Sequence, residues 1–181
     1  WITHSSSKID CSQLGYPSNH GPGKGKCRNW SFGGGGYGTK GEGNDGEETL
    51  LKQIHFGSGG GSGFGGSGFG RSGGIIELII EQQLINHGSI QSNGGDGGNG
   101  WCDDYGGGGS GGSILIELQC QSQSQSHSNK LEQIFGTITC IGGKQDCGNE
   151  GGKGRIAIYG IELSSDDILK IDPKPFNRLN K

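Results

Sequence analysis

The chain has 181 residues, of which 43 are glycine and only 28% are hydrophobic. This length fits one domain, and so small an apolar share leaves little material for a conventional side-chain core. The formal net charge of -3 and the lack of a basic cluster argue against a nucleic-acid partner. The longest apolar run, 75–80, is interrupted by Glu77 and is far too short to span a membrane.

The first 31 residues form an N-terminal, cysteine-containing segment with turn signals at Tyr16-Pro17 and Gly21-Pro22. The tripeptide Asn29-Trp30-Ser31 is an acceptor for N-glycosylation, so we expect an N-glycan on Asn29. The chain contains no methionine, which is typical of a processed or excerpted part of a larger precursor.

Six cysteines predict disulfide bonds and an oxidising, extracytoplasmic setting. Zinc is disfavoured because no two cysteines have the C-x-x-C spacing of zinc ligands. Many pairings are open, and proximity along the chain favours three of them: Cys11 with Cys27, Cys102 with Cys120, and Cys140 with Cys147. We therefore expect a secreted or cell-surface protein.

Residues 32–163 are predicted to form a glycine-rich repeat domain. In each copy a glycine tract precedes an isoleucine-rich strand, and a shorter strand and another glycine tract follow. The long strands are expected at 75–80, at 114–118 and within 152–159, and the short ones at 88–92 and 136–139. The strand at 75–80 is apolar on both faces, which predicts that it is the most buried. Stacked copies would share one core.

Glycine recurs with a period of three in several tracts, for example at Gly106, Gly109 and Gly112. Polyproline II has three residues per turn, so this spacing gives such a helix a bare edge for a neighbouring chain. A flexible linker is the alternative interpretation of these tracts. The predicted fold class is all-β, with glycine-rich polyproline II helices packed beside short β-strands, little or no α-helix, and disulfide staples.

Four stretches resemble the glycine-rich repeat regions of large protist and bacterial surface proteins. They are 33–38, 57–61, 89–95 and 106–116. They are also loosely similar to the glycine-rich ectodomain of the anaplastic lymphoma kinase family of receptors. The resemblance covers roughly residues 15–163 and implies a lattice of polyproline II helices beside short strands. The ligand-contact residues of that receptor family cannot be assigned in these tracts.

No residue pattern indicates a catalytic or metal site. The motif G-x-S-x-G occurs at 70–74 and 108–112, but each copy precedes a strand, whereas a nucleophile elbow lies between a strand and a helix. The histidines are scattered, and the acidic group at Asp96, Asp103 and Asp104 matches no known calcium loop. We expect no enzyme activity, no metal and no cofactor.

Residues 164–181 contain no glycine and include Asp172-Pro173-Lys174-Pro175, which predicts a C-terminal tail or linker. Its apolar side chains are candidates for self-association: Ile168, Leu169, Ile171 and Phe176. The repeats, extended tracts and cysteines together favour an extracellular structural scaffold, such as a surface-coat or filament-forming protein, that associates with itself or with other matrix or surface proteins. The alternative is a ligand-binding glycine-rich module of a receptor ectodomain.

Overall fold

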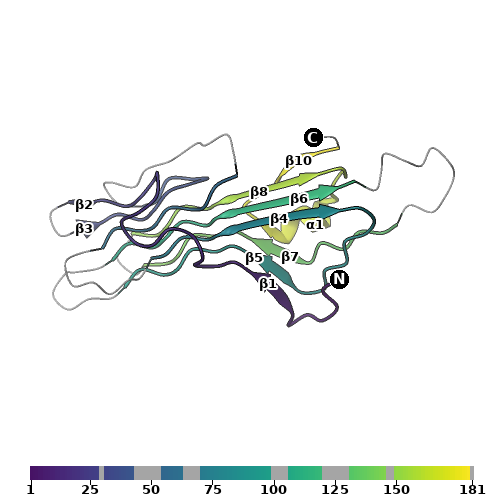
Figure 1. The fold of residues 1–181 in the computed structure, drawn as a ribbon, viewed down its shortest axis with the longest axis horizontal. Coiled ribbons are helices and arrows are strands. Elements are labelled where there is room, and N and C mark those ends of the chain that lie inside the picture. Colours follow the sequence, from purple (N-terminus) through teal and green to yellow (C-terminus); the bar gives the residue numbers. More distant parts are fainter. Residues whose placement is uncertain are drawn as a thin grey trace.

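The computed structural model describes residues 1–28, 31–42, 54–62, 70–98, 106–119, 131–145 and 149–179. Two four-stranded parallel sheets dominate the fold (Figure 1). The long-strand sheet has the order β10 (Phe176–Arg178), β8 (Arg155–Tyr159), β6 (Ser113–Leu118) and β4 (Ile75–Ile80). The short-strand sheet has the order β1 (Lys8–Asp10), β5 (Ser89–Gln91), β7 (Thr137–Thr139) and β9 (Ile171–Asp172). An antiparallel pair, β2 (Cys27–Arg28) and β3 (Ser31–Phe32), and the helix α1 (Ser165–Leu169) complete the described elements.

The chain alternates between the two sheets, passing from β4 to β5, from β6 to β7 and from β8 to β9. Each long strand, the next short strand and their glycine tracts form one coil, and successive coils stack in parallel. The stacking places equivalent residues side by side, so that Ile76, Ile114 and Ile156 form one row across the long-strand sheet. Parallel strands need a crossover connection, which here is the glycine tract together with the strand of the other sheet.

The predicted fold class is wrong, because β-sheets, and not polyproline II helices or disulfides, organise the fold. We expected polyproline II helices and disulfides, whereas two parallel four-stranded sheets organise the described residues, which contain no disulfide. Cys11 and Cys140 are free thiols, and the side chains of their expected partners, Cys27 and Cys147, lie outside the described residues. Cys140 is instead fully buried and packs as a small apolar core residue. The third expected pair, Cys102 with Cys120, lies outside the described residues.

The hydrophobic core lies between the two sheets. Alternate side chains of the long strands face those of the short strands, and Ile116, Ile158, Ile90 and Ile138 are fully buried. Burying one such aliphatic side chain contributes about 1.5–3 kcal/mol. A fold with few hydrophobic residues therefore concentrates them in one narrow layer.

Beyond the strands, the coils continue as a glycine layer, made of residues 33–36, 57–61, 70–74, 106–112, 141–145 and 149–154. It occupies the left side of Figure 1. Segments far apart in the sequence are joined there by backbone hydrogen bonds. Gly35 donates to the carbonyl oxygen of Gly108 over 2.9 Å, and Gly111 donates to that of Gly152 over 3.0 Å.

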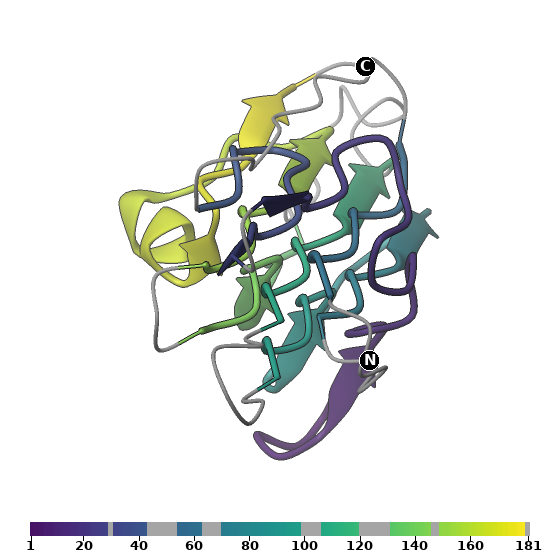
Figure 2. The ribbon, with the colours of Figure 1, turned by 90° about the vertical axis from the view of Figure 1, so that its left-hand side faces the viewer.

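Residues 164–179 form one end of both sheets. The side-chain oxygen of Ser164 accepts a hydrogen bond from the Asp167 amide over 3.1 Å and caps α1. β9 then joins the short-strand sheet and β10 joins the long-strand sheet. Figure 2 shows α1 beside β9, on the side of the molecule away from β1 and β4. The segment expected to be a tail or linker thus contains one edge strand of each sheet.

Candidate functional site

The stack of coils has an open end, formed by the outermost strands β1 and β4. Within the described part of the chain, each of these strands pairs on one side only. The side chain of Ile9 is 37% exposed, although its register partner Ile90 is fully buried. Leu14, just beyond β1, is 62% exposed. The core therefore ends here with apolar side chains in contact with solvent.

This arrangement corrects the expectation that the strand at 75–80 is the most buried. β4 is an edge strand, and Ile79 is 59% exposed on its outer face. β6 is the strand whose side chains are most completely covered, because it lies between β4 and β8. Apolar residues on both faces therefore did not distinguish an edge strand from a central one.

The opposite end of the stack is closed by α1 and β10. Ile168 of α1 packs against the core, and Ile171 is only 4% exposed. The side-chain amide of Asn177 donates to the carbonyl oxygens of Ile158 and Ile161, over 3.0 and 2.8 Å. These contacts cover the last coil.

The four residues predicted for self-association divide into two groups. Ile168 and Ile171 contribute to the protein's own core, whereas Leu169 and Phe176 are 84% and 52% exposed. Self-association through this segment stays a prediction, and only the latter two side chains are largely accessible for it. The predicted glycosylation site, Asn29, lies outside the described residues.

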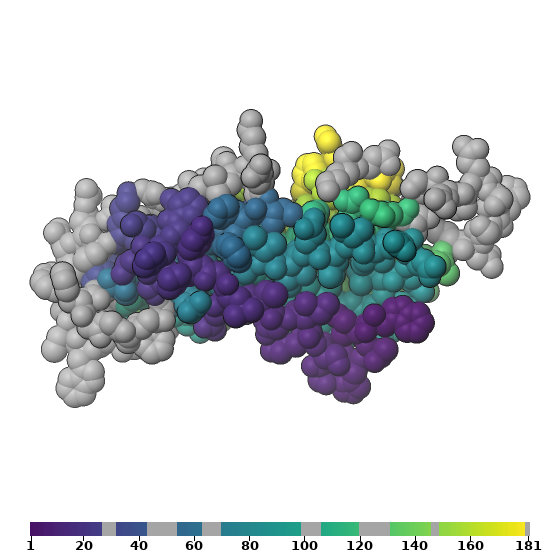
Figure 3. Space-filling model, in the orientation of Figure 1, coloured from purple at the N-terminus to yellow at the C-terminus, as the bar shows by residue number. Residues whose placement is uncertain are grey.

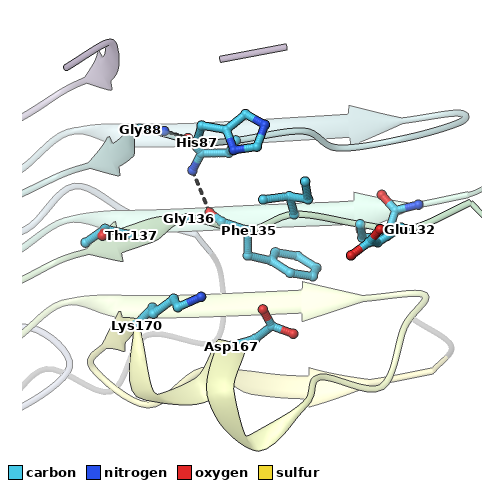
Figure 4. Close-up of a pocket in the computed structure, with 11 residues that line it drawn as sticks. His87, Gly88, Glu132, Phe135, Gly136, Thr137, Asp167 and Lys170 are labelled. Atoms are coloured by element: carbon cyan, nitrogen blue, oxygen red, sulfur yellow. Dashed lines mark hydrogen bonds between the residues drawn. The ribbon is translucent and has the colours of Figure 1, made fainter. Parts of the chain in front are cut away.

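A pocket of ≈ 480 Å³ lies where the coils turn between the sheets (Figure 4). One wall is the segment 132–137 with 86–88, and the other carries Asp167 and Lys170. Asn86 is fully buried behind it, donating to the Phe135 carbonyl oxygen over 2.5 Å and accepting from the Gly88 amide over 3.0 Å. The bond to Phe135 ties neighbouring coils together, and the bond from Gly88 holds the Asn86 side chain within its own coil.

The pocket is lined by groups that bind polar ligands by hydrogen bonds. His87, Glu132, Asp167 and Lys170 all contribute to its lining. One carboxylate oxygen of Asp167 accepts a hydrogen bond from the Ser164 hydroxyl over 2.6 Å, which holds it at the helix start. Among the described residues, no group of three or more His, Cys, Asp or Glu side chains is arranged to hold a metal ion.

The serines of the two G-x-S-x-G motifs are structural residues of the glycine layer. Ser72 and Ser110 are fully buried. The Ser110 hydroxyl accepts from the Ser58 amide over 2.7 Å and donates to the Gly111 carbonyl oxygen over 3.2 Å. Asp96, from the acidic group compared with calcium loops, accepts from the Lys144 amide over 2.8 Å, while Asp103 and Asp104 lie outside the described residues.

Sequence reasoning missed the open end and the pocket. Lys8, Ile9 and Asp10 have the alternation of a strand, but three residues in a segment rich in serine gave too weak a signal. The pocket joins segments 86–88, 132–137 and 167–170, which no spacing rule connects.

No family model, curated protein or solved structure matches the chain. Within the described ranges, the search for a helix of sufficient length and apolarity to cross a membrane found none. Function is therefore argued from the geometry of the protein itself.

Proposed function

We propose that the chain is a structural scaffold module of an extracellular or cell-surface assembly and that it self-associates. The observation that carries this proposal is the glycine layer, in which backbone packs directly on backbone. A Cβ atom on Gly109 would overlap the backbone of Arg71, and one on Gly111 would overlap the backbone of Cys140. Glycine is required at such close approaches, so these tracts serve to hold extended segments together.

The open end supports the self-association part of the proposal. Unpaired strand edges are templates for pairing with another chain. β1 and β4 present two such edges together with the partly exposed side chains of Ile9 and Ile79. The protein stacks its own coils. At this end it has the strand edges and apolar side chains needed to continue the stack with a neighbouring molecule.

Sedimentation velocity over a wide range of protein concentration tests the proposal. We expect the mass to increase with concentration. The double variant Leu169→Ser with Phe176→Ser separates the C-terminal segment from the open end as the site of contact. Point variants are preferable to truncation after Leu163, because truncation removes an edge strand from each sheet. A chain that stays monomeric up to the highest soluble concentration contradicts the proposal.

The extracellular setting rests on the acceptor site at Asn29 and on the cysteine content. Expression through a eukaryotic secretory pathway tests it by intact mass before and after glycosidase treatment. A loss of mass that is abolished in Asn29→Gln supports secretion, whereas an unmodified chain retained in the cell contradicts it.

A ligand-binding module is the second candidate, and the pocket beside α1 favours it. We propose that it would bind a small polar ligand through the side chains of Lys170 and Glu132. Saturable binding of a polar ligand by a monomer, lost in Lys170→Ala and kept in Lys174→Ala, would support this candidate over the scaffold.

A further inference from the structure

The open end is a candidate interface between two copies of the chain; this inference rests on the proposed self-association. We propose that two copies join about a two-fold axis that runs parallel to the strands, midway between the sheets. β1 of each copy then pairs antiparallel with β4 of the other. Figure 3 faces this end, where the β4 region (teal) lies along the front above the N-terminal segment (purple).

The backbone groups needed for this pairing point outward from both strands. In β4, the amides of Ser113 and Gln119 donate to Gly74 and Ile80, so the even-numbered residues bond to β6. The amide and carbonyl groups of Ile75, Glu77 and Ile79 therefore face the open side. In β1, Cys11 donates to Gln91 and Ser7 accepts from Ser89, which turns Lys8 and Asp10 towards the open side.

The two sheets end level with each other at the open end. Gly74, which leads into β4, donates to the Cys11 carbonyl oxygen over 2.9 Å, and Gly112, which leads into β6, donates to that of Ser92 over 2.8 Å. Each short strand thus lies against one long strand, and β1 is outermost on its side. A two-fold axis along the strands exchanges the layers and brings β1 of the partner subunit beside β4.

The position along the strands is set by the same contact. β1 and β4 run in opposite directions, and Cys11 is level with Gly74. Ile9, two residues before Cys11, is therefore level with Ile76, two residues after Gly74. Rotation about an axis parallel to the strands preserves this level. Ile9 therefore lies opposite Ile76 of the partner subunit, with both side chains facing the core between the layers.

Charge favours this register over its neighbour. On the outer face, Lys8 lies opposite Glu77 of the partner subunit, and Asp10 lies opposite Ile75 of the partner subunit. A shift of two residues would keep the hydrogen bonds but would place Asp10 against Glu77 of the partner subunit, which are like charges. Directly opposed like charges destabilise strand pairs, whereas opposite charges stabilise them.

A head-to-tail arrangement of two copies is less favourable. If β10 met β4 head to tail, α1 would lie in the path of β1, because it flanks β9 at the closed end (Figure 2). The two-fold dimer leaves both closed ends outermost.

Disulfide crosslinking of the double variant Lys8→Cys with Glu77→Cys tests the interface. These positions point away from each other on opposite outer faces of one copy, and the sheets alone are about 10 Å apart, so no bond can form within a chain. Across the interface they are opposed. We expect a covalent dimer on mild oxidation, absent from each single variant and from Lys8→Cys with Glu117→Cys. Peptide mapping assigns the bond against the native cysteines.

Charge exchange gives a second readout without cysteine. Lys8→Glu and Glu77→Lys should each weaken the dimer by roughly tenfold, because the axis places two such pairs in each dimer. The double variant should regain the wild-type dimerisation constant. A chain that self-associates normally but shows neither the crosslink nor the rescue overturns this interface and leaves the scaffold proposal standing. A chain that is monomeric at all concentrations overturns both.

Discussion

The glycine layer and the sandwich between the sheets solve the same packing problem with different materials. In the sandwich, aliphatic side chains such as Ile116 and Ile138 fill the space between two backbones. In the glycine layer that space is absent, and amides such as that of Gly108 bond directly to the neighbouring segment. One continuous stack of coils thus changes from side-chain packing to backbone packing without changing its order. The two halves should therefore respond differently to substitution.

The largest effect is expected in the glycine layer. Gly109→Ala places a Cβ atom against the backbone carbonyls of Arg71 and Gly70. Because backbone rather than a flexible side chain must move, we expect a loss of at least about 4 kcal/mol in the free energy of unfolding, or failure to fold. The matched control is Gly106→Ala in the same tract, where the nearest atom is 3.4 Å away. Urea unfolding measures both, and equal losses would contradict backbone packing.

A smaller effect is expected in the sandwich. Ile116→Ala removes a fully buried side chain from the centre of the core, and we expect a loss of about 3 kcal/mol. Ile79→Ala, on the exposed outer face of β4, should change stability by less than about 0.5 kcal/mol. The same unfolding assay compares the two variants. If Ile116→Ala lost no more stability than Ile79→Ala, this core would not be what holds the two sheets together.

The thiols of Cys11 and Cys140 should react at different rates with a thiol reagent. This prediction concerns reactivity and not the free energy of unfolding. Burial raises the pKa of the Cys140 thiol well above its ordinary value, whereas Cys11 is only partly buried at the open end. We expect a neutral-pH thiol reagent to label Cys11 much faster than Cys140, as followed by peptide mass. Equal labelling rates in the folded protein would mean that the core opens at Cys140.

The smallest effect concerns Asp10 at the open end. Its pKa is lowered from 3.8 to about 2, first by the hydrogen bond from Lys8 and then by that from Ser12. A lowered pKa means that the stabilisation is present above pH 4 or so and is lost as the pH falls through about 2. It is small because the carboxylate is exposed. NMR titration of Lys8→Met should show a higher titration midpoint for Asp10. An unchanged midpoint would mean that Lys8 does not lower the pKa of Asp10.

Much of the local structure was predictable from the sequence. The strands expected at 75–80, 114–118 and 136–139 correspond to β4, β6 and β7, with boundaries shifted by one residue at most. Alternation of isoleucine with polar residues and flanking glycines are local properties, so they can be recognised without the fold. The coil spacing was likewise visible as repetition.

The site was far less predictable. Lys8 and Glu77 are distant in sequence, and only the parallel order of the sheets makes β1 and β4 neighbouring edges. The cysteine count predicted staples, but a residue such as Cys140 is placed by the core that surrounds it. The walls of the pocket beside α1 come together only when three coils stack.

The positions of the strands and of the glycine tracts can be read from the sequence, because both follow from periodicity within a few residues. The pairing of the strands into two parallel sheets, the free thiols of Cys11 and Cys140, and the edge position of β4 depend on the tertiary structure. These depend on the order in which coils stack, and that order is set by contacts between residues about 40 positions apart. The open end depends on the same stacking order, which places β1 and β4 at the edges of their sheets.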